Sequence, residues 1–213
     1  MLTLHDYLPS LNGWKIRVLL GKLGIPYQTK PVAIFAGESR TEEFLAKNPA
    51  GAIPVLELED GRSLAESNAI LTYLAEGTPF LPQDRYLRAK VMQWLFFEQY
   101  YVEPAIGTLR FWTLTGRLER NAGGMVDARR ETGARALAAM QRVLKSSPSW
   151  SARNSRSPTS RFMLIRIAPR IAVFPSRTTP PSPLGANACR PRSGRVIRCL
   201  FMEARRSPRK GRF

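Results

Sequence analysis

The amino-acid sequence predicts an α/β domain, with the element order βαβ and then αββα, followed by an all-α domain that is incomplete. Three observations carry this prediction. Short apolar stretches alternate with helical patterns at first, two long helical patterns follow, and the composition then changes sharply. We expect residues 1–78 to form the α/β domain, 79–84 a linker, 85–147 a partial helical domain, and 148–213 a basic tail.

The first half of the α/β domain is predicted as strand, helix and strand. Leu2–His5 alternates apolar and polar residues, as a half-buried strand does. Turn residues occupy Leu8–Gly13, and apolar residues then recur at helical spacing until Gly24 ends the helix. Pro26–Val32 is the second predicted strand.

The second half is predicted as a helix, two strands and a helix. Glu38–Lys47 is a short polar helix that stops at the following Asn-Pro pair. Ile53–Leu58 is a strand, and the Asp-Gly dipeptide after it is a strong hairpin signal, with Leu64 in the returning strand. Ser67 is the predicted N-cap of the last helix.

Two long helical patterns follow the linker, at Tyr86–Trp112 and Met125–Leu144. The first is rich in aromatic residues, most of which we expect in the core of a helix bundle. Pro104 lies inside it and predicts a kink or a break, because proline lacks the N–H that a helix needs.

The net charge of +17 belongs to the basic tail. Residues 1–147 carry 18 Lys and Arg against 15 Asp and Glu, which gives +3. The tail carries 15 Lys and Arg against one acid, Glu203, which gives +14. Its nine prolines set it further apart. The charge is therefore no reason to read the first 147 residues as a nucleic-acid binder.

Several classes of site and location are disfavoured by the composition. The single histidine, His5, argues against a multi-histidine metal site, so we expect no metal. Cys189 and Cys199 form no CxxC motif. No run of about 18 apolar residues is present, and the N-terminus lacks a signal-peptide pattern. We expect a cytoplasmic protein that does not enter a membrane.

Four stretches carry a resemblance to a known family: YLPSLNGWKIRVLL, EFLAKNPAGAIPVLELEDG, LAESNAILTYLAE and YLRAKVMQWLFFEQY. Together they resemble the glutathione transferases over about residues 1–145. The most specific part is an Ile-Pro pair and a Glu-Ser pair with a hairpin between them. The resemblance implies a thioredoxin-like first domain, glutathione as co-substrate, and a homodimer.

The resemblance also implies a residue that activates glutathione. A hydrogen-bond donor aimed at the sulfur favours the thiolate, which is the nucleophile. The family places this donor just after the first strand, where Ser10 is the best match, Asn12 the second candidate and Tyr7 a third, the last favoured more as part of the substrate-site wall. The dipole of the helix that starts there adds to the effect. A purely structural role for Ser10, as the N-cap of that helix, is the alternative.

Further residues are expected to hold the rest of glutathione. By resemblance, Ile53-Pro54 is a cis peptide, which presents the backbone of Ile53 to the cysteinyl backbone of glutathione. The Ser67 hydroxyl and nearby helix N–H groups suit the γ-glutamyl carboxylate, and Glu66 would meet the α-ammonium. An ordinary strand-initiating proline and a simple N-cap are the alternatives.

One position departs from the family. Relatives often carry Lys or Arg just before the Ile-Pro pair, where it meets the glycyl carboxylate, but this chain has Ala52. Arg40 or Lys47 would have to substitute for it.

The pocket for the electrophile is expected between the first loop and the first long helix. By resemblance, Tyr7 and Leu8 contribute from the loop, and Phe97 or Tyr101 from the helix. Spacing alone does not choose between the two aromatic residues.

The basic tail matches neither the family nor any regular period. The family continues here with a glycine loop and a Ser-x-x-Asp capping box. Back-translation of Ser149–Leu184, read one nucleotide earlier, permits both features, and Ser157–Leu164 then becomes IADIALYA. We interpret residues 148–213 as out-of-frame translation and expect them to be mostly disordered. The rival, an arginine-rich tail that binds nucleic acid, lacks aromatic interleaving and a module signature.

The leading functional hypothesis is a glutathione transferase that detoxifies small apolar electrophiles by attack of the glutathione thiolate. Two alternatives stay open. One is a glutathione-dependent disulfide reductase with Asn12 facing the sulfur, in which glutathione itself supplies the thiol, because no cysteine lies near Ser10. The other is an inactive protein of the same fold whose tail binds nucleic acid.

Overall fold

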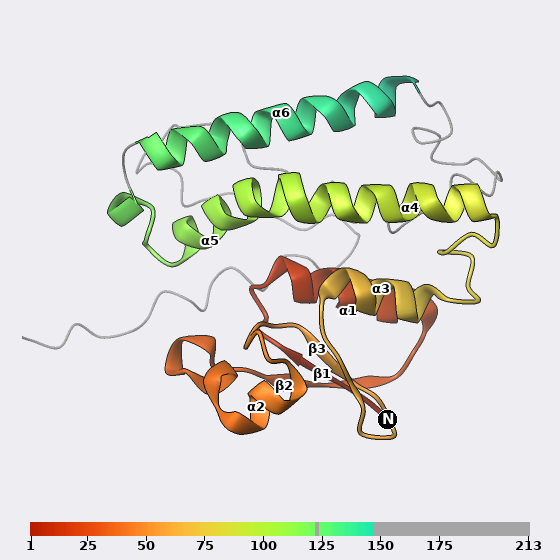
Figure 1. The fold of residues 1–213 in the computed structure, drawn as a ribbon. Coiled ribbons are helices and arrows are strands. Elements are labelled where there is room, and N and C mark those ends of the chain that lie inside the picture. Colours follow the sequence, from red (N-terminus) through yellow and green to blue (C-terminus); the bar gives the residue numbers. More distant parts are fainter. Residues whose placement is uncertain (122–123, 147–213) are drawn as a thin grey trace, which may run out of the picture. The chain divides into compact units, whose positions relative to one another are not determined.

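The computed structural model describes residues 1–121 and 124–146 of the 213 residues. The predictions about the basic tail, both its out-of-frame origin and its disorder, lie outside the described residues. Within them, a thioredoxin-like domain of sheet and helices comes first, and a helical region follows (Figure 1).

The thioredoxin-like domain is built on a four-stranded sheet in the order β2-β1-β3-β4. Its strands are β1 (Leu2–Asp6), β2 (Tyr27–Pro31), β3 (Val55–Glu57) and β4 (Ser63–Leu64). β1 and β2 are parallel, since a helix crosses between them, whereas β1–β3 and β3–β4 are antiparallel. β3 begins only after the Ile-Pro pair, so it is shorter than the predicted strand.

Helices cover both faces of this sheet (Figure 1). α1 (Leu11–Leu23) and α3 (Ser67–Ala75) lie on one face, and α2 (Glu42–Lys47) lies on the other. The main core lies on the α1 and α3 side, and its fully buried members include Leu4, Ile16, Leu20, Leu56 and Ile70. On the α2 side, Phe44 packs against Val32 and Val55.

The segment before α2 differs from the prediction of one helix over Glu38–Lys47. Two short 3₁₀ turns, η1 (Ile34–Ala36) and η2 (Glu38–Arg40), precede the helix. α2 itself starts at Glu42, because Thr41 is extended and its hydroxyl accepts from the Phe44 N–H at 3.3 Å.

The helical region starts with α4 (Arg85–Phe97), η3 (Glu98–Gly107) and α5 (Thr108–Leu114), which run on without interruption. η3 is a π-helical segment that contains Pro104, so of the predicted kink or break the break does not occur. Hydrogen bonds from i to i+5 widen the turn, which accommodates a residue that lacks an N–H.

A second long helix packs beside this one. After the short turn η4 (Glu119–Asn121), α6 (Gly124–Ser146) lies along η3 (Figure 1). Gly133 permits the close approach, since a Cβ there would lie 2.9 Å from Ile106. The Arg129 guanidinium donates to the carbonyl of Pro104. None of the helices described is both long and apolar enough to cross a membrane.

A polar cluster on the α2 face makes a testable contribution to acid stability. The Oε2 atom of Glu57 accepts from Lys47 Nζ at 2.7 Å and from His5 Nε2 at 2.9 Å. These hydrogen bonds, with that from Lys47 first, lower the pKa of the Glu57 carboxyl. Since the pKa is lower in the folded state, the stabilisation is complete above the ordinary carboxyl range and is lost as the pH falls through it.

We expect Glu57→Gln to cost less than about 1 kcal/mol at neutral pH, because the carboxylate is partly exposed. The variant should also lose less stability than the parent between about pH 7 and pH 4. Thermal unfolding followed by circular dichroism across that range checks this. Glu59→Gln, on an exposed residue of the same hairpin, is the control. An identical acid response of the parent and Glu57→Gln would contradict the prediction.

Candidate functional site

A cavity of about 270 Å³ opens between the loop after β1 and the long helix of the helical region. Tyr7, Ser10 and Asn12 line it from the loop and the start of α1, and Ile53 lines it from the segment just before β3. The opposite wall comes from η3 and α5 and includes Glu98, Val102, Glu103, Arg110, Phe111 and Leu114.

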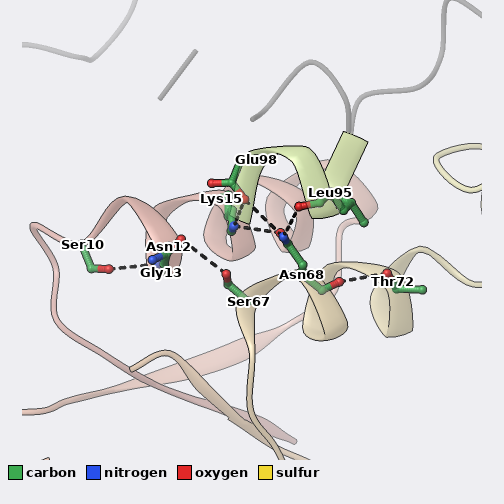
Figure 2. A network of polar contacts seen from close by, with 9 residues as sticks. All are labelled: Ser10, Asn12, Gly13, Lys15, Ser67, Asn68, Thr72, Leu95 and Glu98. Carbon is green, nitrogen blue, oxygen red and sulfur yellow. Dashed lines mark hydrogen bonds and ion pairs between the residues drawn. The ribbon is translucent and has the colours of Figure 1, made fainter. Parts of the chain in front are cut away.

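Ser10 stands at the N-terminus of α1 with its side chain in this cavity. Its Oγ accepts the N–H of Gly13 at 3.3 Å, so the residue is the N-cap of α1 (Figure 2). The cap uses an acceptor lone pair of the hydroxyl. The O–H hydrogen has no acceptor among the described residues and remains available to a ligand. Capping and donation to a ligand are therefore compatible.

A buried ion pair holds the loop that carries Ser10. Asp6 is buried at the end of β1, and its carboxylate binds the guanidinium of Arg17 from α1. Asp6 Oδ1 accepts the Tyr7 N–H at 2.8 Å, and Arg17 donates to the carbonyl of Leu8 at 2.9 Å. Gly13 lies directly against the Asp6 carboxylate. These contacts hold the start of the loop, residues 6–8, against α1.

Asn12 joins this end of α1 to the start of α3. The Ser67 hydroxyl donates to Asn12 Oδ1 at 3.4 Å (Figure 2). Ser67 is not the N-cap that the sequence predicts. The Ile70 N–H bonds to the carbonyl of Glu66, so Glu66 is the cap and Ser67 is the first helical residue.

Glu66 has an unusual backbone. Its φ of 62° lies in the left-handed region and is the one such value for a non-glycine residue in the described part of the chain. A conformation of this kind costs about 1–3 kcal/mol and concentrates at functional sites. It lies directly before α3, whose first residue, Ser67, bonds to Asn12 near the start of α1.

Beneath the cavity, a buried network joins three helices (Figure 2). Lys15 Nζ of α1 donates to Asn68 Oδ1 of α3 at 2.8 Å and to Glu98 Oε2 of η3 at 3.3 Å. Asn68 Nδ2 donates to the same carboxylate oxygen at 3.2 Å and to the Leu95 carbonyl at 3.0 Å. Burial lowers the pKa of Lys15, and the charge of Glu98 opposes that shift.

Sequence reasoning missed this network, although a signal for it existed. Lys15 stands between Leu11 and Leu19 at intervals of four residues, on the buried stripe of the helix. A lysine on that stripe needs a buried partner, but the sequence does not say which acid supplies it.

Glu103 is a second acid of the cavity wall that the sequence did not single out. Burial first, and then the charge of Glu98, raise the pKa of its carboxyl. Gly107 leaves room for it, since a Cβ there would lie 3.0 Å from Glu103 Oε1. Glu98 and Glu103 are five residues apart, which does not place them on one face of a regular α-helix. The π-helical segment brings both to the cavity.

The structure brings several of the predicted residues together. Ser10, Asn12, Ile53 and Tyr7 line one cavity, and Ser67 bonds to Asn12 at its edge. The Ile53-Pro54 bond is cis, as expected.

Other predicted pocket residues lie elsewhere. Leu8 is 54% exposed and does not line the cavity. Phe97 and Tyr101 pack against one another, with ring centroids 4.9 Å apart, and are also outside the lining. The reason is geometric, because the cavity face of η3 is the one that carries Glu98, Val102 and Glu103.

The two cations expected to replace the missing lysine are also outside the lining. Lys47 is held by Glu57 on the α2 face, and Arg40 donates to the Ala50 carbonyl at 3.0 Å. No group of three or more His, Cys, Asp or Glu side chains suited to a metal ion occurs in the described ranges.

Comparison with known proteins places this arrangement among the glutathione S-transferases. The family model described as "Glutathione S-transferase, N-terminal domain" matches residues 9–76. The chain is 34% identical over 148 residues to a maleylacetoacetate isomerase of Rhizobium meliloti (strain 1021), covering 66% of this chain and 67% of that relative. Several other curated relatives are covered over about half of their length or less.

Among solved structures, glutathione transferases are also similar to this chain. A glutathione S-transferase from Pseudomonas fluorescens Pf-5 is similar at 39% identity and a TM-score of 0.70, covering 81% of this chain and 86% of that one. A glutathione transferase from Pseudomonas putida, solved with one glutathione disulfide bound per subunit, shares the fold at 24% identity and a TM-score of 0.61, covering 80% and 84%.

Proposed function

Because the chain belongs to the glutathione S-transferase family, we propose that it binds glutathione beside Ser10 and catalyses attack of the thiolate on a small electrophile in the cavity. The observation that carries this proposal is the state of the Ser10 hydroxyl. Its oxygen is held by the Gly13 N–H, while its hydrogen faces no protein acceptor in the described residues. A thiolate placed there accepts that hydrogen and is stabilised by it.

The proposed position of glutathione follows from the surrounding groups. The cysteinyl backbone pairs with Ile53, and the γ-glutamyl end reaches Ser67 and Glu66 at the start of α3. For the glycyl carboxylate, Arg40 is the better of the two proposed cations. It is exposed and bonded to one neutral carbonyl, that of Ala50, whereas Lys47 is paired with the carboxylate of Glu57.

We also propose that the protein acts as a homodimer. Three aromatic side chains of α4 and η3 support this, because Phe96, Tyr100 and Tyr101 are 71%, 74% and 47% exposed and lie close together in the chain. Exposed apolar patches of this kind mark interaction sites. Size-exclusion chromatography with light scattering gives the mass in solution and checks the proposal. A monomeric mass at micromolar concentration would contradict it.

The test of the activity is Ser10→Ala assayed with glutathione and chlorodinitrobenzene. Removal of one donor to a developing anion costs about 100-fold in kcat. We expect that loss together with a higher pKa of the bound thiol, followed by its ultraviolet thiolate absorbance, and little change in glutathione affinity. Ser10→Thr is the matched control, since it keeps both the cap and the hydroxyl. Full turnover by Ser10→Ala would contradict the assignment.

A second candidate activity is glutathione-dependent disulfide reduction. It is favoured by Asn12, which also lines the cavity and carries two amide N–H donors. If Asn12→Ala, rather than Ser10→Ala, removes the activity, and hydroxyethyl disulfide is turned over in place of chlorodinitrobenzene, this candidate replaces the first.

A further inference from the structure

The cavity that we propose for the electrophile contains a cation with no acidic partner. Arg110 of α5 lines the cavity together with Ser10 and is partly buried. No carboxylate lies within 4.0 Å of its guanidinium in the described part of the chain. Burial lowers the pKa of Arg110, and the phenol of Tyr7, which also lines the cavity, opposes that shift.

The guanidinium is held in place next to the nucleophile loop. Arg110 NH1 donates to the carbonyl of Pro9 at 3.0 Å. An arginine has five N–H donors, so four remain for a ligand, in a planar arrangement that matches a carboxylate. Pro9 directly precedes Ser10, beside which we propose that the sulfur of glutathione binds. A molecule whose carboxylate binds to Arg110 would therefore lie next to that sulfur.

The two carboxylates of the cavity do not neutralise this cation. Glu103 is seven residues before Arg110, which is about 10 Å along a helix. The group whose charge acts on the pKa of Arg110 is the Tyr7 phenol rather than Glu98 or Glu103. The cavity therefore has an acidic end near Lys15 and a basic end near Pro9.

Apolar side chains form much of the remaining wall of the cavity, among them Leu11, Ile34, Phe111 and Leu114. Phe111 is stacked on Phe35, with ring centroids 6.0 Å apart, which holds its ring in place. A ligand that fits both features has an apolar body and one anionic group.

We infer that the electrophile is a carboxylic acid, with its carboxylate on Arg110 and its reactive carbon beside Ser10. This inference rests on the proposed function and narrows the small apolar electrophile that the sequence suggests. Glutathione is the other source of a carboxylate. Of its expected contacts, Ser67 is bonded to Asn12, whereas Arg110 is bonded to Pro9, on the other side of Ser10 in the chain.

The test compares an acid with its own neutral ester. Glutathione adds to trans-4-oxopentenoic acid and to its methyl ester by the same step. The sulfur forms a bond to one alkene carbon, the π electrons move to the other, and that carbon takes up the proton lost by the thiol. No oxidant or reductant is needed. The carboxyl group is attached to the alkene, so the ester is also the more reactive acceptor, and each kcat/KM is therefore divided by the rate constant of the uncatalysed addition of glutathione.

With the full chain, we expect this corrected kcat/KM to be higher for the acid than for the ester. Arg110→Met keeps the apolar stem and should lower kcat/KM for the acid by about 30-fold, with the ester changed by less than about 3-fold. Arg110→Lys should recover part of the loss. Arg88→Met, which removes an exposed arginine paired with Glu76, is the matched control and should change neither substrate.

Binding gives a readout that does not depend on turnover. The saturated analogue levulinate should bind more tightly than methyl levulinate in isothermal titration calorimetry, and Arg110→Met should abolish that preference. Equal affinities, an unchanged acid-to-ester ratio in Arg110→Met, or a loss that falls on glutathione affinity instead would overturn the inference. A separate titration with glutathione alone tests the proposed function, so failure of one is not mistaken for failure of the other.

Discussion

Gly13→Ala is expected to destabilise the protein by about 3–5 kcal/mol, although alanine is the better helix former. An ideal Cβ at residue 13 would overlap the carboxylate of Asp6, which is buried and paired with Arg17. Either the carboxylate moves and the buried ion pair breaks, or α1 shifts away from β1. Both displace the loop that carries Ser10. Urea unfolding gives the free energy, and glutathione titration reports the state of the site.

The matched control is Gly21→Ala on the same helix. Gly21 is exposed, and a methyl group at that position would meet no atom within 4 Å outside its own turn of helix. Helix propensity alone then acts, and we expect a gain of up to about 1 kcal/mol. If Gly13→Ala were as stable as Gly21→Ala, the close contact with Asp6 would be wrong.

Lys15→Met is expected to cost about 3–5 kcal/mol, because it leaves the carboxylate of Glu98 buried without its cation. Lys15 and Glu98 are 1% and 2% exposed, so water does not replace the lost partner. Glu98→Leu should cost a similar amount by leaving the ammonium group unpaired. Chemical unfolding of the full chain measures both values.

The double variant Lys15→Met with Glu98→Leu separates an ion pair from simple packing. Replacement of both charges by apolar groups of similar size is often close to neutral. We expect its cost to fall below the sum of the single costs by about 2 kcal/mol or more. Lys22→Met, on an exposed residue of the same helix, is the control and should change stability by less than about 0.5 kcal/mol. Additive single costs would contradict a coupled pair.

The order of the elements was predictable because the signals for it are local. The Asp-Gly hairpin, the helix end at Gly24 and the two long apolar patterns each depend on neighbouring residues, and each lies where it was expected. The helix boundary at Glu42 was missed, because the 3₁₀ turn Glu38–Arg40 is polar like the first turn of the α-helix that follows it.

The residues of the candidate site were also predicted only in part. Ser10 and Asn12 were found from their position after the first strand, and both line the cavity. Phe97 and Tyr101 were selected on aromatic character within a regular helix. The π-helical segment around Pro104 changes which side chains face the cavity. The local sequence does not indicate where such a segment begins or ends, so this change could not be predicted.

The sequence by itself determined the thioredoxin-like order of elements, the resemblance to the glutathione transferases and the loop that carries the nucleophile-activating candidates. Only the tertiary structure decided that Lys15 meets Glu98, 83 residues further along the chain, and that Arg110 meets the carbonyl of Pro9, 101 residues earlier. The physical reason is that periodicity reports which face of an element is buried, whereas the partner on the opposing element depends on how the helices pack.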